Sequence, residues 1–426
     1  MTPPQTWPPP PPLRTLDDIL ASAATHPVYA PLLAPTPAEQ HTTLGAFPLL
    51  TKSHLIATVP ELLVPPCLTS TYLSPTGGTR TGPRPLFVPT DTSDNRIQRY
   101  LYAQLLRATG TLGPESVVLN LHGGMPMYRS GDLTSSMIDY AGGTELACGV
   151  HASMAQAMEY AGQFGANTVS AADSKLVQLA TWADEHPDQA HNFHTALFTS
   201  EPLSRKQEAF VRRALGVRAI GSVYGSAECG PVAVAPPTTA AGEETRTFVV
   251  DRRMFVVEVV SDGSKVLASS LDSDPAPHPV GEVVLTSLVR HRNPIVRYRT
   301  GDYGVIRAHA SSPELVYVEL HGRDKELSFS LATDYIDVSK IEAIMARYAV
   351  IQWQVVLSAG ESVEFRAVFD SDGGRHNVQE RADAVRSEIR THILGDDIPV
   401  AVNAVGYDEL EKGSMARKLR KVVDNR

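Results

Sequence analysis

Two hydrophobic patterns alternate along the first half of the chain. Segments 94–107 and 154–164 carry apolar residues at helical spacing, whereas 117–121 and 219–223 are short runs of apolar and β-branched residues. The first pattern is typical of amphipathic helices and the second of buried strands. Their alternation predicts an α/β domain in which helices cover a sheet.

The pattern changes near residue 248. From there to residue 306, short apolar runs are separated by turn residues such as Asp262-Gly263 and Thr300-Gly301, which predicts a β-rich subdomain that closes the large domain. The rest of the chain predicts strands near 352–356 and 363–369, a helix over 378–394 and a basic tail. These last elements indicate a small, separate α+β domain.

The patterns divide the 426 residues into three parts. Residues 1–13 are rich in proline, whose ring fixes φ and removes a backbone donor, so we expect an extended tail; docking to a proline-reading domain is the alternative. Residues 14–324 are expected to form the large N-terminal α/β domain with its β-rich subdomain. Residues 325–426 are expected to form a small, mobile C-terminal α+β domain.

Composition narrows the class of partner. The net charge of −9 opposes nonspecific attraction to nucleic acid or an anionic membrane, and no apolar run approaches the ~20 residues that span a bilayer. The proline-rich start does not resemble a secretory signal, so we expect a cytoplasmic location. Cys67, Cys148 and Cys229 form no CxxC pair, which argues against a disulfide framework or a structural zinc site. A small molecule is the expected partner.

The loop over residues 74–84 is rich in serine, threonine and glycine. Hydroxyls and glycine backbone donors can surround a polyphosphate, because glycine lets the backbone approach closely. Loops of this composition are also common turns. Phosphate binding and an ordinary turn therefore both remain open for this segment.

Two further segments have candidate binding residues at or directly after the end of a strand. Residues 222–228 form a strand that ends in Tyr224 and Gly225, followed by Glu228, so an aromatic face and a carboxylate that can hold Mg²⁺ follow the strand. A strand exit with a solvated glutamate is the alternative. Residues 297–302 lead a strand into a turn that presents Asp302, which can accept both ribose hydroxyls, although Gly-Asp is also ordinary turn chemistry.

The order of these segments, followed by Gly322-Arg323 and a lysine near the C-terminus, resembles that of the adenylate-forming ligase superfamily. Two further segments, 48–60 and 198–202, resemble its phenylacetate-CoA ligase branch. The resemblance covers nearly all of the chain after the proline tail.

The resemblance implies a role for each matching residue. One group would hold the β- and γ-phosphates of ATP: Thr76, Gly78, Thr79, Thr81 and Gly82. A second group would frame the adenine: Ser200, Glu201, Pro202, Tyr224 and Gly225.

Other matching positions would carry the remaining roles. The resemblance implies that Glu228 binds Mg²⁺, that Asp302 holds the ribose hydroxyls and that Arg323 lies close to the ribose and phosphate. It also implies that Lys325 is the hinge of the small domain and that Lys418 is the catalytic lysine, counting back from residues 422–424. A solvated basic tail is the alternative for Lys418, because other cations lie nearby.

The acyl pocket is harder to predict. His122, Gly123 and Gly124 follow an apolar strand and could line it together with Tyr128. A histidine after a strand is also an ordinary turn or core residue.

The reaction that the resemblance implies has two steps. A carboxylic acid, with an aryl or arylacetic acid favoured, reacts with ATP and Mg²⁺ to give an acyl-adenylate, which then passes to a thiol of CoA or a carrier protein. Residues 327–334 contain no glycine, whereas relatives that use CoA place one there, and Arg417 stands beside Lys418 in place of a glycine. An amine acceptor, and hence an amide-forming ligase, therefore stays open.

A different class of function is a non-catalytic nucleotide-binding protein. It is motivated by the phosphate loop, which carries an extra residue at Arg80 or Thr81 and ends without a lysine. A metal-dependent hydrolase is poorly supported, because the 14 histidines show no HExxH or comparable ligand spacing. The resemblance also suggests a homodimer.

Overall fold

The computed structural model of the chain describes residues 13–33, 42–64, 68–76, 86–125, 127–149, 151–239, 246–261, 264–273, 275–323, 328–331, 334–358, 362–370, 377–395, 398–412 and 419–425. The proline-rich tail predicted for residues 1–13 lies outside them apart from its last residue. Within these ranges, no helix is long and apolar enough to cross a membrane.

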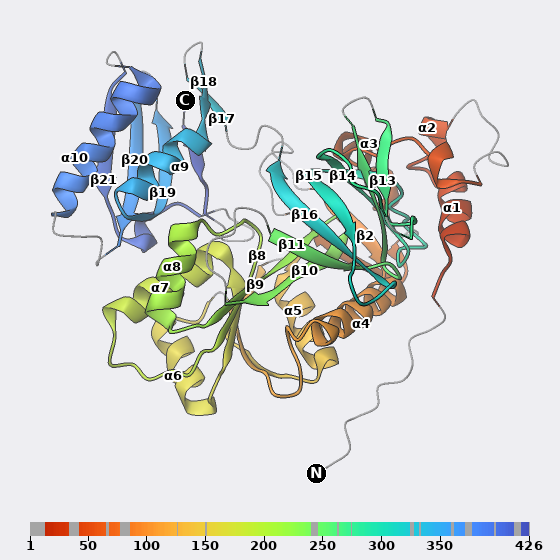
Figure 1. Cartoon of the computed structure of the whole chain (residues 1–426), viewed down its shortest axis with the longest axis horizontal. Coiled ribbons are helices and arrows are strands. Elements are labelled where there is room, and N and C mark those ends of the chain that lie inside the picture. Colours follow the sequence, from red (N-terminus) through yellow and green to blue (C-terminus); the bar gives the residue numbers. More distant parts are fainter. Residues whose placement is uncertain are drawn as a thin grey trace.

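Short helices form the N-terminal part, which is red in Figure 1. They are α1 (Leu16–Thr25), α2 (Ala30–Leu33), a 3₁₀ turn (Leu44–Ala46) and α3 (Lys52–Leu62). Thr15 and Asp18 form a capping box at the start of α1, which satisfies backbone donors that the first turn leaves without partners. Thr51 and His54 do the same for α3, so Lys52 has a fixed position as its first residue.

Five parallel strands form one half of a twelve-stranded sheet, in the order β6-β3-β7-β8-β9. They are β3 (Val117–Asn120), β6 (Thr144–Ala147), β7 (Thr168–Ala172), β8 (Thr195–Thr199) and β9 (Ala219–Ser226). The helices of this half are α4 (Thr92–Ala108), α5 (Ser130–Ala141), α6 (Met154–Phe164), α7 (Asp173–Glu185) and α8 (Arg205–Leu215). The predicted α/β fold, with helices near 94–107 and 154–164, is therefore confirmed.

Local sequence accounts for several of these helix ends. Ser153 and Ser204 form capping boxes with the glutamines three residues later and so begin α6 and α8. Gly165 and Gly216 end the same helices with positive φ, a conformation that costs glycine little.

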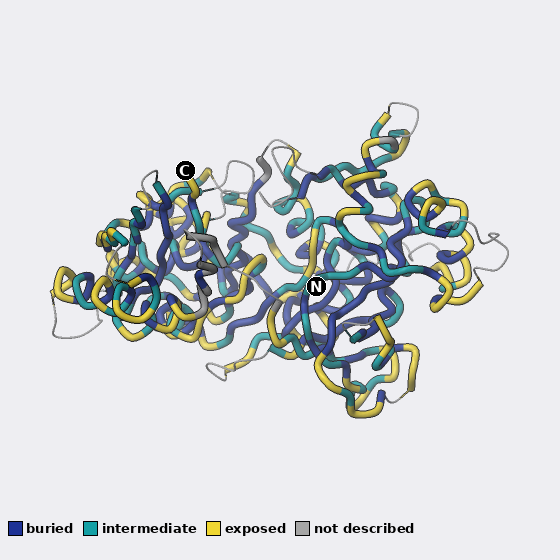
Figure 2. Tube along the Cα trace, turned by 90° about the horizontal axis from the view of Figure 1, so that it is seen from above, coloured by how far each residue is buried: buried dark blue, intermediate teal, exposed yellow. Residues whose placement is uncertain are grey.

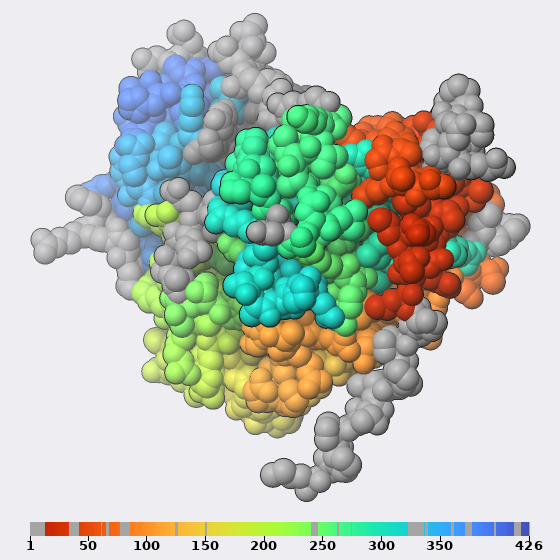
Figure 3. All heavy atoms as spheres, turned by 45° about the vertical axis from the view of Figure 1, so that its right-hand side comes forward, coloured from red at the N-terminus to blue at the C-terminus, as the bar shows by residue number. Residues whose placement is uncertain are grey.

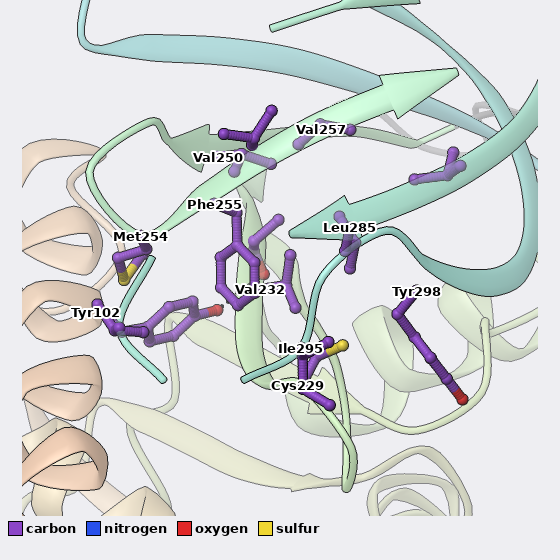
Figure 4. Packing of buried hydrophobic residues seen from close by; sticks show 14 of the residues in the cluster. Tyr102, Cys229, Val232, Val250, Met254, Phe255, Val257, Leu285, Ile295 and Tyr298 are labelled. Carbon is purple, nitrogen blue, oxygen red and sulfur yellow. Dashed lines mark hydrogen bonds between the residues drawn. The ribbon is translucent and has the colours of Figure 1, made fainter. Parts of the chain in front are cut away.

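Seven antiparallel strands continue the same sheet. They are β10 (Gly230–Thr238), β11 (Arg246–Asp251), β12 (Phe255–Val260), β13 (Val266–Ser269), β14 (Gly281–Ser287), β15 (Tyr298–Ala308) and β16 (Leu315–Arg323), in the order β10-β11-β16-β15-β14-β12-β13. The predicted β-rich region is present, and its backbone hydrogen bonds join it directly to the parallel strands. Figure 4 shows the core of this half, where Phe255 packs near Val232 and Ile295.

The turn predicted at Thr300-Gly301 is wrong, because β15 continues through these residues. Glu282 pairs with Tyr303 and Val284 with Arg299, so the extra residues between Arg299 and Tyr303 form a bulge in β15. Thr300 Oγ1 donates to the Val283 carbonyl, Gly301 N–H donates to Glu282 Oε1, and Gly301 takes a φ of +79°. Strand β14 thus supplies hydrogen-bond acceptors for two residues of the bulge. The other predicted turn, at residues 262–263, lies outside the described residues.

The C-terminal elements form a separate sheet in the order β21-β20-β19-β22. The elements are β17 (Ser328–Leu331), β18 (Asp334–Asp337), α9 (Val338–Arg347), β19 (Val350–Ser358), β20 (Ser362–Phe369), α10 (Val378–Ile389), a π-helical turn (Arg390–Leu394), β21 (Val400–Ala404), a 3₁₀ turn (Tyr407–Glu409) and β22 (Val422–Asp424). The predicted α+β character is confirmed, with α10 ending in the π-helical turn.

This C-terminal part has a hydrophobic core of its own, which includes Trp353, Phe365 and Val385. In Figure 2, buried segments run through the interior of both parts of the molecule. On the face shown in Figure 3, the C-terminal part (blue) and the N-terminal helices (red) lie on opposite sides of the green and cyan residues of the large sheet's region.

Candidate functional site

The carboxyl ends of four neighbouring parallel strands carry the candidate residues. His122 and Gly123 follow β3, Ser174 follows β7, Ser200 follows β8, and Tyr224 lies near the end of β9. Thr199 of β8 is in register with Val223 of β9, so Ser200 and Tyr224 are the next residues on adjacent strands. Ligands of open α/β sheets bind at this edge.

A cavity of about 260 Å³ opens along this edge. The strand ends contribute Leu121, His122, Gly123, Ala172, Thr199 and Ser200. The helices and loops around them contribute Tyr128, Ser130, His151, Ser174, Lys175 and Gln178.

The small C-terminal part covers the cavity with Tyr407, Asp408 and Lys412. The buried Tyr407 hydroxyl donates a hydrogen bond to the Ser174 carbonyl, and burial raises the pKa of Tyr407 far above its ordinary value, so the phenol stays protonated. Gln178 Nε2 donates to Asp408 Oδ1 at 2.8 Å, and the Lys412 ammonium lies 4.9 Å from the Tyr407 ring centre. The two hydrogen bonds join the two parts of the chain at the cavity, and the Lys412–Tyr407 contact lies within the C-terminal part.

Three of the four predicted acyl-pocket residues line the same cavity. His122, Gly123 and Tyr128 line the cavity, and His122 is buried. Gly124 lies in the short strand β4 (Gly124–Met125), which pairs with β5 (Tyr128–Arg129), and the described lining does not include it.

Tyr224 and Asp302 meet although they come from different motifs. The Tyr224 hydroxyl donates to Asp302 Oδ2 at 2.5 Å, and the Tyr224 ring centre lies 5.6 Å from that of Phe248. Burial and the Asp302 carboxylate raise the pKa of Tyr224 well above its ordinary value, so it remains a donor. The two residues predicted to contact adenine and ribose therefore lie side by side.

Glu228 is buried just after β9, and its carboxylate pairs with an ammonium. Lys52 Nζ lies 3.1 Å from Glu228 Oε1, and the Arg290 guanidinium donates to the Glu228 carbonyl. Among the described residues, no group of three potential ligands could hold a metal ion by itself. A single carboxylate still fits Mg²⁺, which takes most of its ligands from phosphates and water.

The other predicted adenine residues lie at the ends of β8 and β9. Ser200, Glu201 and Pro202 are exposed, and Ser200 takes a φ of +91°, which is uncommon for a residue other than glycine. A Cβ at Gly225 would clash with the Gly230 carbonyl on β10, so only glycine fits that position. Of this set, Ser200 alone is part of the described cavity lining.

Two candidates lie next to segments outside the described residues. Thr76 is buried and pairs with Leu86 through two hydrogen bonds, at the loop end of the hairpin formed by β1 (Thr71–Pro75) and β2 (Phe87–Asp91). The backbone of Arg323 pairs with Asp302 across β15 and β16. The remaining candidates lie outside the described residues: Gly78, Thr79, Thr81, Gly82, Lys325 and Lys418.

Several residues at the site were not predicted from the sequence. Lys52 lies in the segment 48–60 that resembles the ligase branch, but no role was predicted for it. Lys175, Tyr407 and Lys412 belong to no recognised motif. Nothing local marks these residues, since each reaches the site from a different element. Lys412 offered the weak signal of lying close before the tail that contains Lys418.

Neither a protein-family model nor a curated protein sequence matches this chain. Solved structures do. A 2-hydroxyisobutyryl-CoA ligase in its postadenylation state is similar with a TM-score of 0.70 and 16% identity, covering 96% of this chain and 88% of that one. The same ligase in its thioesterification state gives 0.60 at the same identity and coverage. An anthranilate CoA ligase bound to anthranoyl-AMP gives 0.52 at 14% identity, covering 81% of this chain and 64% of that one.

The chain has the fold of the adenylate-forming CoA ligases. The similarity extends over nearly the whole chain, including both the large sheet and the small C-terminal sheet. The resemblance in the sequence to this adenylate-forming fold is thus matched by the structure. At this level of identity the likeness concerns the fold, and chemistry has to be argued from the site.

Proposed function

We propose that the chain uses ATP to activate a carboxylic acid as an acyl-adenylate and then transfers the acyl group to a thiol. The observation that carries this proposal is the cavity at the carboxyl ends of β3, β7 and β8. It unites His122, from the predicted acyl pocket, with Ser200, from the predicted adenine site, under a cover from the small domain.

The nucleotide would lie along β8, β9 and β15. Tyr224 and Ser200 would contact the adenine, while Asp302 would accept the ribose hydroxyls. A carboxylate can accept about four hydrogen bonds, so Asp302 can retain its bond from Tyr224 while it accepts others. The phosphates would extend toward Thr76 and the loop that follows it.

Catalysis would depend on charge stabilisation. The attack of a carboxylate on the α-phosphate brings two anions together, so cations fixed around the phosphates lower the barrier. Mg²⁺, held by Glu228, would neutralise phosphate charge when bound. Lys418 would stabilise the same charge, and the described residues beside it support this: Leu419 pairs with Lys412, which lines the cavity.

The division of the chain at residues 13–14 and 324–325 is part of this proposal, with Lys325 as the hinge of a mobile small domain. The sheet β21-β20-β19-β22 and its separate core support such a unit. A movable small domain would let one active site perform adenylation and thiol transfer in turn.

The acceptor can be the thiol of CoA or of a carrier protein. The segment after the proposed hinge lacks glycine, so an amine acceptor is the competing outcome. Supplying CoA, a carrier protein and amines separately to the formed adenylate distinguishes the three. The resemblance favoured an aryl or arylacetic acid, and the same assay compares such acids with others.

The test of the proposal is the exchange of pyrophosphate into ATP that depends on an added acid. Glu228→Gln and Lys418→Ala should each reduce this exchange by on the order of 10²–10³-fold, because each removes stabilisation of phosphate charge. Arg420→Ala, an exposed cation in the same tail, serves as the matched control and should leave exchange unchanged. ATP binding without exchange for any acid would instead indicate a non-catalytic nucleotide-binding protein.

A further inference from the structure

The cavity lining is rich in hydrogen-bonding side chains. Leu121 and Ala172 are the only aliphatic residues among the described ones that line it. His122 and Ser174 are buried at the cavity wall, and Lys175 stands in the first turn of α7 beside them. Pockets for apolar ligands are instead lined mainly by hydrophobic and aromatic groups.

Size alone does not select the acid. An apolar protein cavity of about 150 Å³ holds a benzene ring, so the ~260 Å³ measured here has room for either an aryl ring or a short polar chain. The chemistry of the lining therefore decides between them.

The position of the cavity identifies it as the acyl side of the site. Ser200 directly follows β8, and Tyr224 lies in the neighbouring strand β9. On the other side of β8, the sheet continues with β7 and then β3. If the acyl group of the adenylate extends from the α-phosphate in the direction opposite to the adenine, it enters the space bounded by His122 and Lys175.

We propose that the activated acid is a short, hydrophilic one that carries a second hydrogen-bonding group, either a hydroxyl or a second carboxylate. The inference rests on the proposed adenylation. An aryl ring in this space would lie against the polar side chains of His122, Ser174 and Lys175 without offering them a hydrogen bond, whereas a hydroxyl or carboxylate can offer one. Of the two lysines in the lining, Lys412 pairs with Asp408 at 3.4 Å, and Lys175 adds a positive charge that suits an anionic or oxygen-rich group.

The test is a series of matched acids in the pyrophosphate-exchange assay. Lactate is compared with propionate, malonate with butyrate, and both pairs with benzoate and phenylacetate. At least one substituted acid should exceed its unsubstituted partner in kcat/KM by on the order of 100-fold or more, because a site built to hydrogen-bond a substrate group rejects an analogue without it. A preference for lactate over propionate indicates that the site recognises a hydroxyl, whereas a preference for malonate over butyrate indicates that it recognises a second carboxylate.

Two variants connect this preference to the cavity. Lys175→Met and His122→Leu should each reduce the ratio between substituted and unsubstituted acid at least tenfold, a change that a loss of folding alone would not produce. Lys265→Met, in an exposed turn away from the cavity, should leave the ratio unchanged. An unchanged ratio in both cavity variants overturns the inference.

The remaining outcomes separate the inference from the function on which it rests. Exchange that is fastest with benzoate or phenylacetate overturns the hydrophilic acid and leaves adenylation standing. Absence of exchange with every acid overturns both.

Discussion

The Tyr224 hydroxyl donates to the Asp302 carboxylate at 2.5 Å, although 78 positions separate the two residues in the sequence. Their strands, β9 and β15, are themselves separated by β10, β11 and β16 in the sheet. Neighbouring strands lie about 4.8 Å apart, so a flat sheet would hold the two strands about 19 Å apart. The side chains cannot span that distance, and the sheet must therefore curve strongly at this point.

Removing this hydrogen bond should weaken nucleotide binding. Tyr224→Phe keeps the ring and deletes the donor, and a hydrogen bond to a charged group contributes about 1.5–3 kcal/mol. We expect the Kd for AMP to rise at least tenfold, measured by calorimetry. Tyr160→Phe, at a tyrosine that is 42% exposed on α6, is the matched control. An unchanged Kd in Tyr224→Phe would remove Asp302 and Tyr224 from the nucleotide site.

The ion pair between Lys52 and Glu228 should compete with Mg²⁺. Lys52 is 39% exposed and lies 3.1 Å from the buried Glu228 carboxylate, so the ammonium can leave when a divalent cation binds. Lys52→Met removes the competitor, and the Mg²⁺ concentration for half-maximal pyrophosphate exchange should fall several-fold. Lys340→Met, at an exposed position of α9, is the control. A midpoint that stays the same or rises contradicts the assignment of Glu228 to the metal.

Arg297 and Glu258 form a buried pair that supports the sheet. Their Nε and Oε2 atoms lie 3.0 Å apart, and Arg297 Nη1 also donates to the Phe47 carbonyl. Glu258→Gln leaves the guanidinium charge buried without its counterion, which typically costs about 3–5 kcal/mol. The midpoint of urea unfolding should drop accordingly, while Glu314→Gln, at an exposed site, should not change it. A decrease in the unfolding free energy of less than about 1 kcal/mol would contradict a structural role for the pair.

Asp132 should contribute to the dependence of stability on pH. Burial tends to raise its pKa, but the hydrogen bond and charge of Arg99, with the charge of Arg129, outweigh this and lower the pKa below its ordinary value. Because the folded state holds this proton less tightly than the unfolded chain, the stabilisation is present above about pH 4 and is lost as pH falls through the folded-state pKa.

The measurement is urea unfolding of the protein and of Asp132→Asn between pH 7 and pH 3. The difference in unfolding free energy should be largest at pH 7 and should shrink as the pH falls. Asp132 is 42% exposed, so solvent screening keeps the effect to about 1 kcal/mol or less. Asp188→Asn, at an exposed loop position, gives the baseline. A constant difference across the range would show that the charge of Asp132 does not matter.

The sequence alone determined the local elements. Helical periodicity over 154–164 predicted α6 with little help from the rest of the chain, because a helix satisfies its backbone within one segment, and the structure adds the capping box at Ser153. The buried runs that became β3 and β9 were predictable for a similar reason, since their residues are apolar wherever the strand is placed.

Turn chemistry was less informative where a neighbouring strand intervened. Thr300 and Gly301 suggested a turn, but β14 supplies partners for both residues and turns the segment into a bulge within β15. A single sequence gives no information about which strand will lie alongside, so this error could not be avoided by local reasoning.

Only the tertiary structure decided which candidates share a site. The curvature of the sheet brings Tyr224 to Asp302, the first turn of α3 brings Lys52 to Glu228, and the packing of the C-terminal part brings Tyr407 to Ser174. Each contact joins residues far apart in the chain. Such contacts depend on how whole elements pack. The local sequence pattern determines which face of its own helix or strand a side chain lies on, but it does not determine which other element packs against that face.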